Sequence, residues 1–277
     1  MGSVILSLLL VGCEVERPDD TRSIHPFGGE ELVLFSYYET GSNTLLVEAS
    51  HTIPVYELGA PREVDDLVVR ASLGGEDYVL SYSGQGTYVA VVDPVPAGAL
   101  LSISVSHSDY GEVASEQVVV PQKTFLEDTE VRRVNDRILI RGSYDFLPGL
   151  SYSSKLLRYG EGGEIGNGGT HLLPIIGAVD DLSAEIGRTR EHSFRSEFVV
   201  FDRESLVPID TVRVDSVAMV LYAWSYEVAP FLKSVAETGG QFGDGLESID
   251  GVTYTNVRNG YGLVTAFATD TVIYVLE

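Results

Sequence analysis

The sequence predicts a mainly β protein with two β-sandwich-like domains and one short helix near the C-terminus. Short segments rich in β-branched and aromatic residues recur along most of the chain, and glycine, asparagine and proline separate them. One segment has the spacing of an amphipathic helix followed by a glycine stop. The 277 residues, of which 44% are hydrophobic, suffice for one large or two modest domains.

Residues 32–121 are predicted to form an immunoglobulin-like β-sandwich. Apolar residues occupy every second position in residues 67–73, and Ile103 and Val105 alternate with serines in the strand expected over residues 100–107, as in strands with one buried face. Further strands are expected over residues 32–38, 45–50, 78–82, 87–92 and 116–120. Several short strands at regular spacing, divided by turn residues, are typical of an antiparallel sandwich.

Residues 122–277 are predicted to form a second β-rich domain. Strands are expected over residues 131–134, 137–141, 150–159, 194–201, 211–224, 253–257 and 263–276. The helix is expected over residues 225–237, with its regular part beginning near Ala229 because Pro230 follows. Residues 160–169 contain six glycines and predict a long loop, since a phosphate cradle would need a following helix and usually a lysine.

Residues 1–12 are predicted to be a lipoprotein signal peptide. The apolar run over residues 2–12 has the length of a signal-peptide core and is too short to span a bilayer. The segment Leu10-Val11-Gly12-Cys13 resembles the bacterial lipobox, which implies cleavage before Cys13 and lipidation of its thiol. Each buried CH₂ of an acyl chain contributes about 0.8 kcal/mol, so several chains anchor a protein permanently. The alternative is a buried N-terminal strand with an incidental cysteine.

Residues 13–31 are predicted to be a flexible acidic tether. The segment is polar, carries several acidic residues and is interrupted by Pro18 and Pro26. Acidic residues just after a lipidated cysteine resemble the surface-export signals of Bacteroidetes lipoproteins. We therefore expect a protein anchored in outer-membrane lipid through Cys13 and exposed at the cell surface.

The net charge of −23 argues against nucleic acid as a partner, because no basic stripe is present to neutralise phosphates. Two interpretations of the charge remain open. One is solubility and repulsion from an anionic cell surface. The other is capture of cations or of cationic ligands.

No residue set predicts a catalytic centre, a cofactor site or a metal site. The five histidines are scattered without the short spacing of zinc ligands, and no Gly-x-Ser-x-Gly segment is present. His171 and His192 flank the long loop region, where the alternatives are membership of a site and surface or internally hydrogen-bonded side chains. Asp244, Glu247 and Asp250 lie close together in a glycine-rich segment, where the alternatives are a solvated acidic loop and a calcium site.

Three segments follow one another in the C-terminal third: residues 221–227 (LYAWSYE), 231–235 (FLKSV) and 254–262 (YTNVRNGYG). In this order they resemble the DUF4249 family of Bacteroidetes outer-membrane lipoproteins. Residues 86–88 (GTY) and 94–98 (PVPAG) agree in the N-terminal half, whereas residues 263–267 (LVTAF) depart from the family's Phe-Gly. The resemblance implies a β-sandwich lipoprotein that works beside a TonB-dependent, SusC-like channel, and it transfers no catalytic residues.

Two interpretations of the aromatic C-terminal segment stay open. In the first, Trp224 and Tyr226 pack beside the helix, and Asn256, Gly260 and Gly262 shape the turn that receives it. In the second, the aromatic residues form a platform for a sugar or a peptide.

The leading functional hypothesis is a lipid-anchored binding or accessory protein at an outer-membrane uptake channel. The lipobox, the lack of a catalytic signature in the sequence and the family resemblance favour it. The alternatives are a cell-surface hydrolase of glycan or peptide and a structural or adhesive envelope lipoprotein. A cleft lined by converging carboxylates or a Ser-His pair would favour the hydrolase.

Overall fold

The computed structural model describes residues 31–52, 63–134, 137–160, 163–164, 189–195, 197–201, 208–237 and 254–276. Strands dominate these residues, and a short helix lies near the C-terminus, so the predicted fold class is confirmed. Among the described residues, no helix has the length and apolar character needed to cross a bilayer.

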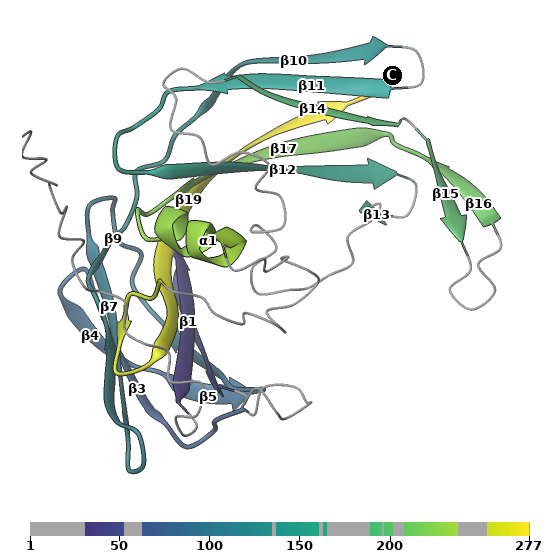
Figure 1. Ribbon diagram of the computed structural model, residues 1–277. Coiled ribbons are helices and arrows are strands. Elements are labelled where there is room, and N and C mark those ends of the chain that lie inside the picture. The colour runs from purple at the N-terminus through teal and green to yellow at the C-terminus, as the bar shows by residue number, and fades with distance from the viewer. Residues whose placement is uncertain are drawn as a thin grey trace, which may run out of the picture.

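The N-terminal half forms a sandwich of two sheets (Figure 1). One layer is part of an eight-stranded sheet and contains β19 (Tyr261–Val275), β1 (Leu32–Glu39), β2 (Thr44–His51), β6 (Thr87–Val91) and β5 (Ser81–Gly84). The facing layer contains β18 (Val257–Arg258), β8 (Gly111–Ser115), β7 (Leu100–His107), β3 (Val68–Leu73) and β4 (Glu76–Val79), with β9 (Val118–Val119) paired to β7.

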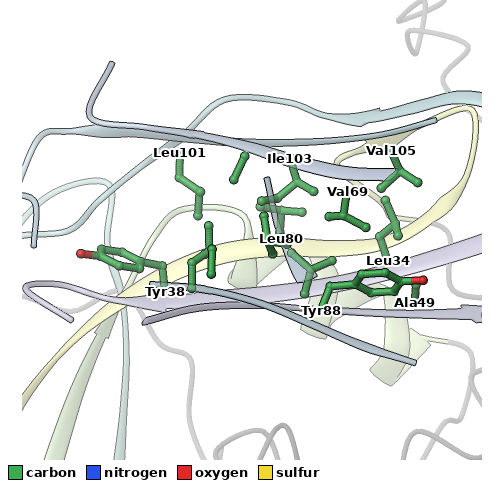
Figure 2. Packing of buried hydrophobic residues seen from close by; sticks show 14 of the residues in the cluster. Leu34, Tyr38, Ala49, Val69, Leu80, Tyr88, Leu101, Ile103 and Val105 are labelled. Atoms are coloured by element: carbon green, nitrogen blue, oxygen red, sulfur yellow. The ribbon is translucent and has the colours of Figure 1, made fainter. Parts of the chain in front are cut away.

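The sandwich core forms because alternate residues of each strand point inward. Figure 2 shows Leu34 and Tyr38 of β1 on one side and Val69, Ile103 and Val105 of β3 and β7 on the other. All five side chains are buried. Burying one such side chain contributes about 1.5–3 kcal/mol, so this alternation is the main source of the sandwich's stability.

The strand expected over residues 78–82 is two strands in different sheets. β4 pairs with β3 in one layer, and β5 pairs with β6 in the other. Leu80 lies between β4 and β5 and is buried in the core. The chain therefore crosses from one layer to the other at Leu80, and the apolar pattern alone does not reveal the change of sheet.

The second half of the chain builds the remaining sheets. The eight-stranded sheet continues from β19 through β17 (Ser216–Trp224) and β12 (Ser151–Gly160) to β13 (Gly163–Glu164). A three-stranded sheet contains β10 (Leu126–Val134), β11 (Arg137–Tyr144) and β14 (Thr189–Arg195), and β15 (Glu197–Phe201) pairs with β16 (Pro208–Arg213). Buried residues of β11, β12 and β17, among them Ile140, Tyr152 and Met219, form a second core cluster.

Several predicted strands of this half differ from the observed ones. The strand expected over residues 194–201 belongs to both β14 and β15, which lie in separate sheets. The strand expected over residues 211–224 is likewise divided at Val214 and Asp215, and the Asp215 amide donates to the carbonyl of Tyr159 at 2.8 Å. At the start of the glycine-rich stretch, Gly160 pairs with Gly163, whereas residues 161–162 and those from 165 on lie outside the described residues.

Strand β19 joins the two halves of the structure. Its first part pairs in parallel with β1, from Val33 with Tyr261 to Glu39 with Phe267. Its second part pairs antiparallel with β17, as Figure 1 shows for the long yellow strand. Strand β19, from the C-terminal part of the chain, thus completes the sandwich predicted for residues 32–121. The domain boundary at residue 121 remains a prediction.

The helix α1 (Val228–Glu237) confirms the expected helix near the C-terminus. Pro230 lies in the first turn of the helix. Backbone N–H groups in that turn have no intrahelical acceptor, so the missing N–H of proline costs the helix no hydrogen bond. Phe231 and Leu232 are buried and pack against Trp224 and Phe267. The helix therefore lies in the angle where β19 passes from β1 to β17 (Figure 1).

We predict that Gly262→Ala strongly destabilises the protein. Gly262 lies opposite Leu34 with φ +120°, and a Cβ there would be 1.8 Å from the Leu34 carbonyl oxygen. Strain and clash should lower the free energy of unfolding by about 2–4 kcal/mol, measured by urea unfolding with the fluorescence of the single tryptophan. Gly98→Ala is the matched control, since Gly98 also has positive φ but no atom near a Cβ. Equal losses in the two variants would contradict a steric role for Gly262.

Candidate binding site

The outer face of the eight-stranded sheet carries a cluster of aromatic side chains. Alternation along β1 sends Leu34 and Tyr38 into the sandwich and leaves Phe35 and Tyr37 on the opposite side of the sheet. Strand pairing then brings residues of β17 and β19 onto this side. We call the following set the aromatic face: Phe35, Tyr37, Tyr222, Trp224 and Phe267.

Four rings of the aromatic face, those of Tyr37, Phe267, Trp224 and Tyr222, form a connected series across three strands. The Trp224 ring lies 4.9 Å from that of Phe267 and stacks on Tyr222 at 5.8 Å. Phe267 also lies 6.4 Å from Tyr37, and Phe35 meets Phe231 of α1 edge-on at 6.2 Å. Aromatic pairs at these distances and angles contribute about 0.5–1.5 kcal/mol each beyond the area they bury. The helix and these contacts fix the positions of Tyr37 and Tyr222, which are only half-buried.

Glu48 of β2 adjoins the aromatic face. It pairs with Phe35 in the sheet register, so both side chains lie on the outer side. Burial raises the pKa of Glu48 to about 7, because removal from water disfavours the charged carboxylate. Among the described residues, its carboxylate has no hydrogen-bond or ion-pair partner. A half-buried acid with these properties titrates near neutral pH.

The two half-buried tyrosines each lie near a carboxylate. Burial, together with the charge of Glu48, raises the pKa of the Tyr37 phenol. Burial, together with the charge of Glu39, likewise raises the pKa of the Tyr222 phenol. Glu39 accepts a hydrogen bond from the Thr269 hydroxyl at 2.6 Å. The site therefore offers ring faces, two neutral phenol groups and two acceptor carboxylates.

The packing interpretation of the C-terminal aromatic segment holds for Trp224, which is 2% exposed and donates from Nε1 to the Ser153 hydroxyl at 2.9 Å. Trp224 is therefore no open platform. Tyr226 differs, since it is 65% exposed. Asn256 is buried and clamps Val264, accepting from its amide at 2.9 Å and donating to its carbonyl at 2.7 Å.

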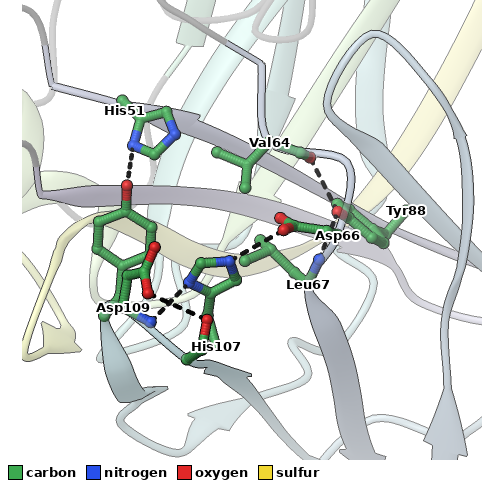
Figure 3. A network of polar contacts seen from close by, with 9 residues as sticks. His51, Val64, Asp66, Leu67, Tyr88, His107 and Asp109 are labelled. Carbon is green, nitrogen blue, oxygen red and sulfur yellow. Dashed lines mark hydrogen bonds and ion pairs between the residues drawn. The ribbon is translucent and has the colours of Figure 1, made fainter.

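Two of the histidines that are far apart in sequence meet around one tyrosine. Tyr110 lies between His51, whose Nδ1 is 3.0 Å from the phenol oxygen, and His107, whose ring stacks on it at 4.9 Å. The Asp109 amide donates to His107 Nδ1, so Nε2 carries the proton and donates to Asp66 at 3.1 Å (Figure 3). These bonds tie the β7–β8 turn to β2 and to the segment before β3. Sequence reasoning missed the cluster because strand pairing, not spacing, brings its members together.

The remaining predicted site residues are not tested by the structure. Cys13 and the acidic segment with Asp244, Glu247 and Asp250 lie outside the described residues, as does His171. His192 lies in β14, where its side chain is not described. Within the described part of the chain, no three His, Cys, Asp or Glu side chains gather as a metal site would require.

Comparisons with known proteins give no family. No family model matches the chain, and no curated protein matches it. Among solved structures, a Bacteroides uniformis protein for which carbohydrate binding is proposed has 11% identity and a TM-score of 0.24, covering 90% of this chain and 100% of that one. The chicken interferon gamma receptor alpha chain has 8% identity and a TM-score of 0.18, covering 72% and 90% respectively. These TM-scores are too low to support an argument about fold or function.

We predict that Glu48→Gln stabilises the protein at alkaline pH. The folded carboxyl has a pKa of about 7, above its ordinary 4.5, so the folded state retains a proton that the unfolded state loses between these values. The wild-type free energy of unfolding should fall as pH rises through that window. Because the carboxylate is partly exposed and screened, the gain in the variant should be about 1–2 kcal/mol at about pH 8.

Urea unfolding at about pH 5 and about pH 8 measures this difference, which should shrink at the lower pH. Glu76→Gln serves as the control, since Glu76 is exposed on β4. A stabilisation by Glu48→Gln that is equally large at both pH values would contradict the argument from burial.

Proposed function

We propose that this chain is a lipid-anchored binding protein of the bacterial outer membrane that acts beside a TonB-dependent uptake channel. The observation that carries the proposal is the abrupt step at Cys13, where a lipobox-like apolar run gives way to an acidic segment. Eighteen residues, 14–31, separate Cys13 from the first strand at Leu32. At about 3.3–3.6 Å per residue, their fully extended length is about 60 Å, enough to place the sandwich clear of the lipid headgroups.

The aromatic face supports a binding role. It is held in place by β17, β19 and α1, and it presents Tyr37 and Tyr222 together with a carboxylate that has no partner among the described residues. Ligand sites commonly combine apolar walls with a few polar groups that orient the ligand. We propose membership of the DUF4249 family on the C-terminal segments quoted above, and from it the channel as neighbour.

We predict that Cys13→Ala abolishes lipidation. Wild-type protein from cells fed labelled palmitate should carry the label and sediment with membranes, whereas the variant should carry none and lose membrane association, because thiol acylation supplies the anchor. Ser3→Ala, in the predicted signal peptide, is the matched control and should leave labelling unchanged. Unlabelled wild-type protein that stays in the soluble fraction would overturn the proposed anchor.

We predict that affinity purification from detergent-solubilised outer membranes recovers a TonB-dependent channel with this protein. Mass spectrometry of the eluate identifies the channel, and an unrelated lipoprotein bearing the same tag controls for nonspecific capture. Repeated recovery of this protein alone, under conditions that preserve known channel complexes, would contradict the proposed partner while leaving the lipid anchor standing.

A further inference from the structure

Glu48 lacks the cationic partner that two other described acidic side chains have. Asp270 is paired with Lys123 at 3.1 Å, and Glu116 approaches Arg258 at 3.5 Å. Glu48 is half-buried and has no such partner among the described residues, and burial is the cause of its raised pKa. A basic group close to it would have lowered that pKa instead. Among the described residues, the carboxylate is thus a desolvated acceptor without a counter-charge.

We propose that the aromatic face binds a basic side chain of a peptide, a guanidinium or ammonium group that pairs with Glu48 and lies against the ring of Tyr37. This inference rests on the proposed function, because it names the ligand class of the proposed binding face. A cation within about 6 Å of a ring centroid gains about 0.5–2 kcal/mol from the ring, more as water is excluded. Pairing also removes the unfavourable burial of an uncompensated charge.

A cation fits this site better than a neutral sugar does. Sugar hydroxyl groups could donate hydrogen bonds to Glu48 and stack on Tyr37, but they would leave the half-buried charge uncompensated. A second carboxylate, Glu39, lies on the same face near Tyr222, which further disfavours anionic ligands. The net charge of −23 adds a long-range attraction for cations. Guanidinium is favoured because its plane can stack on a ring while its N–H groups bond a carboxylate.

The charged and titratable groups around Glu48 define how binding should depend on pH. Tyr37, Glu39 and Tyr222 share its face, and Thr87 lies opposite it on β6. On α1, Lys233 is exposed and has an interaction of its own. Because only ionised Glu48 pairs with a cation, affinity should rise with pH through about 7 and then level off.

The test uses the full-length protein in nonionic detergent micelles and a matched pair of acetylated pentapeptide amides. One peptide has a central arginine among glycines, and the other has uncharged citrulline in its place. Isothermal titration calorimetry at about pH 8 and low salt should show the arginine peptide binding at least about tenfold more tightly. Glu48→Gln should remove that preference and the pH dependence, and Glu76→Gln should preserve both.

The remaining outcomes separate this inference from the proposed function. Equal affinity for the two peptides, or an unchanged preference in Glu48→Gln, would overturn the cation site. An oligosaccharide that binds wild-type protein, loses affinity in Tyr37→Ala and keeps it in Glu48→Gln would retain the binding face but reject its cationic specificity. Absence of binding by either peptide to palmitate-labelled wild-type protein would reject this inference and leave the membrane anchor unaffected.

Discussion

The parallel pairing of β1 with β19 is the contact on which both the sandwich and the candidate site depend. It joins residues more than two hundred positions apart, and it needs a close approach of the Gly262 backbone to the Leu34 carbonyl. A side chain at position 262 would push the strands apart. Since β19 continues beyond Phe267 to pair with β17, the same contact joins the N-terminal sandwich to the rest of the eight-stranded sheet.

This shared strand also determines which side chains reach the outer face. Pairing of β19 with β1 places Thr265 beside Tyr37, and pairing with β17 places Phe267 opposite Trp224. The Ser225 hydroxyl lies 2.8 Å from that of Thr265, which fixes the chain just before α1. The helix then covers one part of the aromatic face and leaves Tyr37 half-buried at its border.

Local pattern predicted the individual strands better than their partners. Residues 101–105 alternate cleanly because one face of β7 is buried, and the sequence shows this directly. The sequence around Val33 does not indicate that Tyr261 is its neighbour, since many strands of similar composition could pair with β1. Leu80 illustrates the same limit, because the β-forming residues 78–82 give no sign that the chain changes sheets there.

The candidate site left a signal in the sequence that was available but ambiguous. Residues 32–38 are apolar or aromatic at nearly every position, and a strand with both faces covered typically has this composition. The outer positions Phe35 and Tyr37 therefore indicated a second packing layer on β1. Glu48 gave no comparable signal, because an acidic residue within a strand normally faces solvent. Its environment depends on strand pairing, which places it opposite Phe35 of β1 and Thr87 of β6.

The overall charge and the local site make separate contributions to ligand selection. A net charge of −23 attracts every cation, but screening limits that attraction to about 8 Å at physiological salt. Discrimination between basic peptides and simple ions must therefore come from short-range contacts. The ring of Tyr37 beside a partly desolvated Glu48 supplies such contacts. A hydrated metal ion gains little from the ring. A guanidinium group gains binding energy from both the ring and the carboxylate. The long-range field concentrates cations near the surface, and the aromatic face selects among them.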